Sequence, residues 1–169
     1  IKLTAYTPCF RREAGSYGKN VRGLNRLHQF DKVEIVQLAH PEKSYSNLKN
    51  MVKHVSNLLE ALELPFRLVK LCGGDLSFSS ALTYDFEVFS GGQGKWLEVS
   101  SVSNFESFQA TRSNIKFREN SNLNFCHTLN GSALALPRIM ATILENNQTE
   151  SGIKIPKQLY KYTGFKIIS

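Results

Sequence analysis

Two extended runs on either side of a glycine-rich loop constrain the fold of this chain more than any other feature. Residues 3–13 carry β-branched and aromatic side chains around Tyr6, Thr7 and Phe10, and residues 25–38 form a second run with the sequence NRLHQFDKVEIVQL. The segment between them is polar and holds glycines at positions 15, 18 and 23, which disfavours both helix and strand there. We therefore expect a long antiparallel hairpin.

One face of this hairpin is too polar to cover a core. Side chains alternate across a strand, so Arg11 and Glu13 are expected to share a face of the first run. On the return strand the same rule groups Arg26, His28, Phe30, Lys32 and Glu34. The opposite, more apolar face of that strand is formed by Leu27, Val33 and Ile35, interrupted by Gln29 and Asp31.

The remaining pattern predicts helices packed on a sheet. Apolar residues spaced by three and four from Tyr45 to Leu62 indicate an amphipathic helix that ends before Pro65. A buried strand is expected at 66–72, two strands joined by the turn GGQG at 83–102, a short helix and strand at 105–119, and a loop at 120–124. From residue 125 a strand should run into a final helix with Pro137 in its first turn. The fold class is therefore α+β, a mixed fold with a mostly antiparallel β-sheet flanked by helices.

Composition narrows the class of protein. The 169 residues, 41% of them hydrophobic, suit one ordinary globular domain. No apolar run approaches the roughly 20 residues that span a bilayer, and residues 1–10 lack the apolar centre of a signal peptide, so we expect a cytoplasmic protein with no membrane contact. Three cysteines in no paired spacing are expected to be reduced. The formal charge of +7 raises the possibility of a polyanionic partner such as nucleic acid.

The hairpin face carries the chemical groups that bind a nucleotide. Arg11 can contact a phosphate with two donors, Glu13 can accept hydrogen bonds from an amino group, and Phe30 offers a ring on which a base can stack. From the residue types alone, an exposed strand face with ordinary ion pairs is the simpler interpretation.

Two segments further along the chain add a carboxylate and a cationic side chain to the candidate site. Glu98 lies beside serines in LEVSS, a set that suits Mg²⁺ bound with phosphates, although a solvated strand glutamate is the simpler reading. Arg138 follows Pro137 at a helix start, where an anion is favoured, and an ordinary surface arginine is the alternative interpretation. Ser132 in NGS can be a helix cap. The histidines show no metal-binding spacing, and no glycine motif matches a Rossmann or P-loop site, so a nucleotide would bind on the sheet face.

Taken together, three segments closely resemble the catalytic domain of the seryl-tRNA synthetase family of class II aminoacyl-tRNA synthetases. They are PCFRREAGSYGKNVRGLNRLHQFDKVE, KWLEVSS and TLNGSALALPR, and the tail GIKIPKQLYKYTGF is similar to bacterial members. The first segment resembles motif 2, at about 3–38, and the last resembles motif 3, at about 125–147. The resemblance covers residues 1–169 and implies a partial class II catalytic core.

The resemblance implies a role for each matching position. Arg11 matches the motif 2 arginine that holds the ATP α-phosphate, and Arg138 matches the motif 3 arginine over the adenine and terminal phosphate. The implied ATP-binding set is Arg11, Arg12, Glu13, Arg26, Leu27, His28, Gln29, Phe30, Glu98, Val99, Ser100, Ser101 and Arg138. Glu34, Asn130 and Ser132 match the serine-binding positions, and Glu98 with Ser101 matches the ligands of the Mg²⁺ that accompanies ATP.

The implied activity is activation of L-serine by ATP and its transfer to tRNA(Ser), by a homodimer in the full-length protein. The N-terminal tRNA-binding helical arm, motif 1 and the Thr-x-Glu serine segment of the family are absent from these residues, so we expect a fragment with weak or no activity alone. Two alternatives stay open: a ligase that joins an amino acid to a carrier protein, and a non-catalytic binding module that keeps the fold.

One detail of the implied metal site requires irregular backbone. Strict alternation places Glu98 on the same face as Ser100, not Ser101. If Glu98 and Ser101 are both ligands, a β-bulge or a strand end must lie between them.

Overall fold

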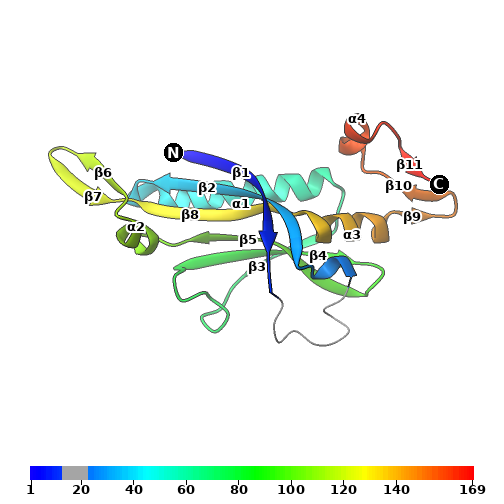
Figure 1. Cartoon of the computed structure of the whole chain (residues 1–169), viewed down its shortest axis with the longest axis horizontal. Helices are drawn as coiled ribbons and strands as arrows, with labels where there is room; N and C mark the ends of the chain where they lie inside the picture. Colours follow the sequence, from blue (N-terminus) through cyan, green and yellow to red (C-terminus); the bar gives the residue numbers. More distant parts are fainter. Residues whose placement is uncertain (13–22) are drawn as a thin grey trace.

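A six-stranded antiparallel sheet forms the centre of the molecule. The computed structural model describes residues 1–12 and 23–169. The sheet order is β1-β2-β8-β5-β4-β3, and every neighbouring pair is antiparallel. The strands are β1 (Lys2–Phe10), β2 (Gln29–Ala39), β3 (Phe66–Lys70), β4 (Leu82–Ser90), β5 (Lys95–Asn104) and β8 (His127–Ala135). The expected fold class is confirmed (Figure 1).

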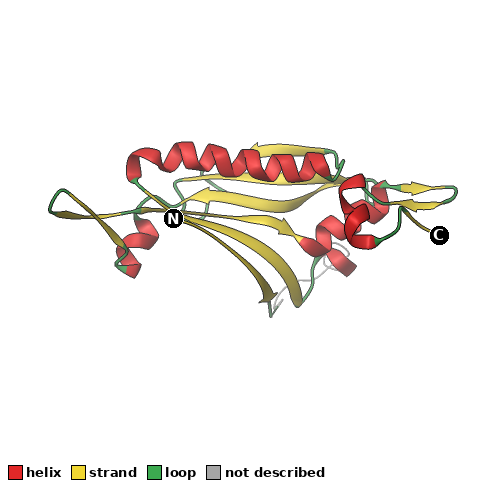
Figure 2. Cartoon of the chain, turned by 90° about the horizontal axis from the view of Figure 1, so that it is seen from above, coloured by secondary structure: helices red, strands yellow, loops and turns green. Residues whose placement is uncertain are grey.

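Two helices cover one face of this sheet. The helices are α1 (Ser44–Ala61) and α3 (Leu136–Asn146), and Figure 2 shows α1 running lengthwise along the sheet. Leu48, Met51, Val55 and Leu59 of α1 are almost fully buried in the same apolar cluster as Phe86, Val102, Leu129 and Ile139. Because the helices take one face, the polar side chains of the strands are left on the other. No helix in the described residues is long and apolar enough to cross a membrane.

Smaller elements extend beyond both ends of the sheet (Figure 1). One hairpin of β6 (Lys116–Glu119) and β7 (Asn122–Phe125) follows α2 (Phe108–Ser113), and the 3-10 turns η2 (Gly23–Asn25) and η3 (Pro41–Lys43) precede β2 and α1. After α3 come β9 (Gln148–Thr149), β10 (Gly152–Lys154), η4 (Lys157–Leu159), α4 (Tyr160–Thr163) and β11 (Ile167–Ile168). The chain thus continues past α3, which the sequence predicted to be the final helix.

Three sequence predictions of elements are wrong in detail. Residues 120–124 are mostly the strand β7, because the turn needs only two residues and Asn120 adopts a positive φ of 49°. The strand at 66–72 is short and largely exposed, since it lies at the edge of the sheet and pairs only with β4. The return strand begins at Gln29 rather than at residue 25, because residues 23–25 wind into the turn η2.

The hairpin of β1 and β2 keeps a regular register up to its open end. Lys2 pairs with Gln37, and the pairing continues without a shift to Phe10 and Gln29. One further backbone bond, from Arg11 N to His28 O at 2.8 Å, extends the ladder past the strand. Arg11 is therefore fixed by the sheet although it lies outside it.

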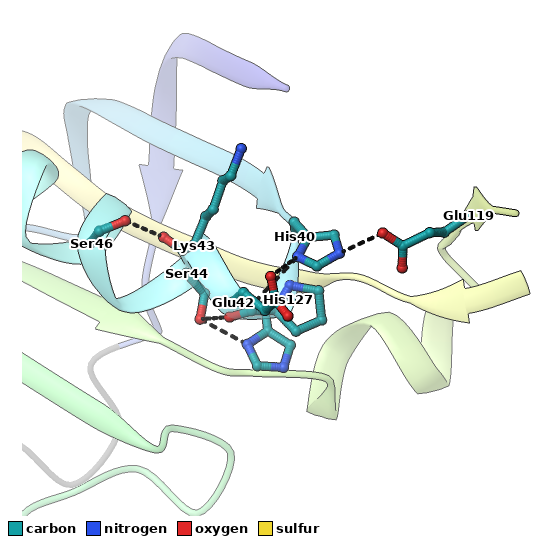
Figure 3. Close-up of polar contacts among 8 residues, drawn as sticks. His40, Glu42, Lys43, Ser44, Ser46, Glu119 and His127 are labelled. Carbon is teal, nitrogen blue, oxygen red and sulfur yellow. Dashed lines mark hydrogen bonds and ion pairs between the residues drawn. The ribbon is translucent and has the colours of Figure 1, made fainter.

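A polar cluster around the buried Ser44 joins the start of α1 to the start of β8 (Figure 3). Ser44 is fully buried, and its Oγ lies 2.8 Å from His127 Nδ1 and accepts a hydrogen bond from Asn104 Nδ2 at 3.2 Å. His40 bridges to the β6–β7 hairpin, with Nε2 3.4 Å from Glu119 Oε1 and its ring against Phe117. These contacts hold α1, β8 and the hairpin together.

Replacing Gly131 by alanine should destabilise the sheet. A Cβ at this position in β8 would lie 2.9 Å from Val102 Cγ2 and 3.2 Å from the carbonyl oxygen of Ser101, in a part of β5 with no room to move. We expect the free energy of unfolding to fall by about 1–3 kcal/mol in urea titrations. Gly73→Ala, where no described atom lies within 4 Å of the added Cβ, is the matched control; equal stability of the two variants would contradict the packing described here.

His127 should make stability depend on pH. Burial lowers the pKa of His127 below its ordinary value, Glu106 opposes this and His40 adds to it. The unfolded chain then binds more protons, so stability falls as the pH drops below about 6.5. His127→Asn should cost about 1 kcal/mol of unfolding free energy at about pH 7.5, and clearly less at about pH 5.5, measured by urea unfolding. A cost that is the same at both pH values would refute this role of His127.

Candidate active site

A cavity of about 170 Å³ opens on the polar face of the sheet. Its wall is built from four parts of the chain: the end of β1, the turn η2 with the start of β2, the middle of β5, and the junction of β8 with α3. The lining residues are Arg11, Leu24, Asn25, Arg26, Leu27, Phe30, Lys32, Glu98, Val99, Ser100, Ser101, Ser132, Ala135, Pro137 and Arg138. Arg11, Phe30, Glu98 and Arg138, far apart in sequence, therefore converge on one hollow.

A β-bulge in β5 explains how Glu98 and Ser101 share this hollow. Glu98 pairs with Glu87 of β4, but Ser100 pairs with Phe86, so β5 has one extra residue between the two pairs. The bulge also lets Val99 and Val102 both enter the core, where each is almost completely buried. The irregular backbone expected between Glu98 and Ser101 is confirmed.

Arg138 ties the start of α3 to the cavity wall. Its Nε donates to the carbonyl oxygen of Asn25 at 3.0 Å, and its Nη1 donates to the carbonyl oxygen of Glu98. Burial lowers the pKa of Arg138, and Glu98 opposes this shift. The side chain is thus a positioned cation at a helix N-terminus, where anions are favoured.

Two neighbouring carboxylates, Glu98 in the cavity wall and Asp85 beside it, make part of the site acidic. Burial raises the pKa of Glu98, the charge of Asp85 raises it further, and Arg138 and Arg11 oppose the rise. Asp85 pairs with Ser101 across β4 and β5. Burial also raises the pKa of Asp85, and a hydrogen bond with Ser101 opposes it. Asp85 Oδ1 is buried and has no hydrogen-bond partner among the described residues. This part of the site therefore favours a cation.

Arg11 and Phe30 meet at the end of the hairpin. The Arg11 guanidinium carbon lies 4.9 Å from the centre of the Phe30 ring, within the range of a cation–π interaction. The backbone pairing of Cys9 with Phe30 and of Arg11 with His28 sets this geometry. A permanent positive charge and an aromatic face are therefore offered together to the cavity.

Glu34 and Ser132 are brought together across β2 and β8. The two residues pair in register, and Ser132 Oγ donates to Glu34 Oε2 at 3.2 Å. Lys32 Nζ lies 3.1 Å from the same carboxylate oxygen. Asn130 is two residues before Ser132 on β8 and so faces the same side of the sheet, although it does not line the cavity.

The other expected site residues differ in position. Arg26 and Leu27 both line the cavity, so the alternation predicted for residues 26–34 is wrong at 26–28, because these residues precede the regular strand. Phe30 and Lys32 share the cavity side as predicted. His28, Gln29 and Arg12 are exposed and do not line it. Ser100 donates a hydrogen bond to the carbonyl oxygen of Ser132 at 2.6 Å. Glu13 lies outside the described residues, and its predicted role near an adenine stays a prediction.

Four residues that lie at or beside the cavity were not predicted from the sequence as part of the binding site: Asp85, Lys32, Asn25 and Pro137. An acid at alternate positions of an otherwise apolar strand, as in TYDFEVFS, was a usable signal for Asp85. Asn25 gave no such signal, since its contacts depend on residues distant in sequence. In the described residues, no group of three or more His, Cys, Asp or Glu side chains is placed to hold a metal ion by itself.

The comparison with known families explains this arrangement. Residues 1–147 match the model of the tRNA synthetase class II core domain (G, H, P, S and T). The chain belongs to this family of class II tRNA synthetase cores.

Individual relatives agree with the family. A serine–tRNA ligase of Salinibacter ruber is 55% identical over 167 residues, which cover 97% of this chain and 39% of that protein. A serine–tRNA ligase of Neisseria gonorrhoeae is 55% identical over 166 residues, which cover 97% of this chain and 38% of that protein. The crystal structure of seryl-tRNA synthetase from Pyrococcus horikoshii complexed with ATP superposes with a TM-score of 0.94 at 42% identity, covering 100% of this chain and 39% of that one. This class II core thus spans about two fifths of the length of the relatives it matches.

Arg138→Lys should loosen the class II core. Lysine keeps the charge, but its single amine cannot reach both the Asn25 and Glu98 carbonyls as the guanidinium fork does. We expect the free energy of unfolding to fall by about 1–2 kcal/mol in chemical denaturation. Arg112→Lys is the control, because Arg112 donates only within its own helix, to the Phe108 carbonyl. An equal loss of unfolding free energy in Arg138→Lys and Arg112→Lys would contradict this role of Arg138.

Proposed function

We propose that this chain forms the ATP-binding and serine-activating core of a serine–tRNA ligase. The observation that carries the proposal is the convergence of Arg11, Phe30, Glu98 and Arg138 on one cavity of a class II core. Relatives at 55% identity named serine–tRNA ligase support the choice of amino acid. In the reaction the serine carboxylate attacks the α-phosphorus of ATP and pyrophosphate leaves, which gives seryl-adenylate. The seryl group then passes to a ribose hydroxyl of tRNA(Ser), and AMP is released.

The proposed first step, formation of seryl-adenylate, requires positive charge and precise positioning, and the cavity residues can supply both. Attack of a serine carboxylate on the α-phosphorus brings two anions together, so positioning and positive charge are the main sources of rate. Arg11, held by the ladder bond to His28, would contact the α-phosphate. Phe30 would stack on the adenine, and Arg138 would lie over the adenine and the terminal phosphate. Arg26 and Lys32 also line the wall and add positive charge.

The acidic part of the site fits a Mg²⁺ ion that enters with ATP. Glu98 and Ser101 present oxygen donors to one hollow, and the partnerless Oδ1 of Asp85 lies beside them. Hard cations such as Mg²⁺ prefer such oxygen ligands and usually share them with substrate phosphates. Bound there, Mg²⁺ would neutralise part of the phosphate charge. Glu98 and Ser101 are the residues that would hold it.

The pair Glu34 and Ser132 is the proposed serine subsite, with Asn130 nearby. Its carboxylate and hydroxyl can hydrogen-bond the amino and hydroxyl groups of serine. A site built on such bonds rejects alanine strongly, since alanine would leave buried polar groups unpaired. Binding of tRNA(Ser) and assembly as a homodimer stay predictions from the resemblance, and a cytoplasmic location stays a prediction from composition.

Serine-dependent exchange of pyrophosphate into ATP tests the proposal. We would measure it on a chimera in which residues 1–169 replace the matching part of the Salinibacter ruber relative, and on the 169 residues alone. The chimera should exchange with serine and not with alanine, and the 169 residues alone should show weak or no exchange. Arg11→Ala should lower the rate in the chimera at least about a hundredfold, because it removes the charge at the transition state, with an unchanged thermal melting curve.

Exchange that depends on another amino acid would overturn the choice of serine. A folded chimera that exchanges with no amino acid would favour a non-catalytic module. Serine-dependent exchange without transfer to tRNA would point to a ligase for a carrier protein.

A further inference from the structure

The turn between β4 and β5 is built to be held by the end of α3. Asn146, the last residue of α3, accepts a hydrogen bond from Gly91 N at 2.8 Å and donates one to the carbonyl oxygen of Phe89 at 2.8 Å. A Cβ at Gly91 would lie 2.8 Å from Asn146 Oδ1, and one at Gly92 would lie 3.1 Å from the Glu145 side chain. A side chain at either glycine would push the Asn146 or Glu145 side chain away, so the two glycines let α3 hold the turn closely.

From this fixed turn, Gln93 contacts the segment beside the cavity. Its Oε1 accepts a hydrogen bond from Asn25 Nδ2 at 2.6 Å, and its Nε2 donates to Asn25 Oδ1 at 3.4 Å. The same Nε2 lies 3.1 Å from Glu145 Oε1, which fixes the orientation of the Gln93 amide. The two amides therefore form a reciprocal pair between residues 68 positions apart.

Asn25 in turn holds Arg138. Its carbonyl oxygen accepts from Arg138 Nε at 3.0 Å, and Asn25 itself lines the cavity. Both ends of α3 are thus linked through Asn25: the C-terminal end by Glu145 and Gln93, the N-terminal end by Arg138. In Figure 1 the short turn before β2 lies next to the loop that joins β4 to β5.

We propose that Gln93 is a positioning residue for the nucleotide cavity. Together with Asn25 it forms an amide latch that fixes the turn η2 and, through the Asn25 carbonyl, the guanidinium of Arg138. The latch acts at a distance: Gln93 is exposed and does not line the cavity. Its effect on ATP rests on the proposed function, whereas its effect on η2 does not.

A structural role alone would give a different result from a positioning role. The Gln93 and Asn25 amides are on the surface, so their loss should change the global stability little. What should change is the order of residues 23–28 and the fit of the cavity to ATP.

The test uses the full 169-residue chain with four variants: Gln93→Ala, Asn25→Ala, the double variant, and the swap Asn25→Gln with Gln93→Asn. Hydrogen–deuterium exchange of residues 23–28 should be faster in both single variants, and the double variant should add little, because either change breaks the same pair. The swap keeps both amides and their combined length, so it should recover most of the protection. Gln158→Ala, at an exposed glutamine in η4, is the matched control and should behave as the unchanged chain.

Calorimetric titration with ATP and Mg²⁺ gives the second measurement. We expect each single variant to raise the Kd of ATP about three- to tenfold, as for the loss of one or two hydrogen bonds, and the swap to restore it. Melting temperatures should stay close to that of the unchanged chain.

Several outcomes would overturn the latch. Unchanged exchange at residues 23–28 in Gln93→Ala would show that the pair holds nothing, and so would fully additive effects in the double variant. Faster exchange over the whole chain would make Gln93 a residue of general stability. If the unchanged chain binds no ATP, the proposed function fails for the isolated core, while the exchange at residues 23–28 still decides whether the latch exists.

Discussion

The packing of α1 and α3 on one face of the six-stranded sheet determines where every other functional part lies. Leu48, Val55 and Leu59 of α1 are buried against Phe86, Val102 and Leu129 of the strands. Because side chains alternate along a strand, burying one set sends the next set to the far face. Glu98, Ser101 and Ser132, the strand residues that face the cavity, belong to that far face, and the apolar core thereby sets the position of the polar site.

The bulge at Val99 lets β5 serve the core on one face and the cavity on the other. Without an extra residue, Val99 and Val102 could not both enter the core, and Glu98 and Ser101 could not both face the cavity. A single irregular residue thus satisfies the packing of the interior and the donor set of the site. Such bulges are frequent next to functional sites because they change the direction of individual side chains.

The cavity brings charges of both signs together. Arg11, Arg138 and Glu98 line it, Asp85 lies beside it, and burial raises the pKa values of the two carboxylates. The guanidinium of Arg138 is held by the backbone carbonyl oxygens of Asn25 and Glu98. A ligand that brings both phosphates and a divalent cation would complement charges of both signs, which is why the proposed function centres on ATP with Mg²⁺.

The sequence by itself determined the antiparallel hairpin, an amphipathic helix over about 45–62, the glycine turn of β4 and β5, and a helix with Pro137 in its first turn. These features follow from local periodicity and from glycine and proline, whose backbone preferences do not depend on distant residues. Only the tertiary structure decided that β3 is an exposed edge, that residues 23–28 leave the strand, and that Asn25 links Gln93 to Arg138. Those features depend on contacts between residues far apart in the chain, and spacing within one segment carries no information about which distant side chains will meet it.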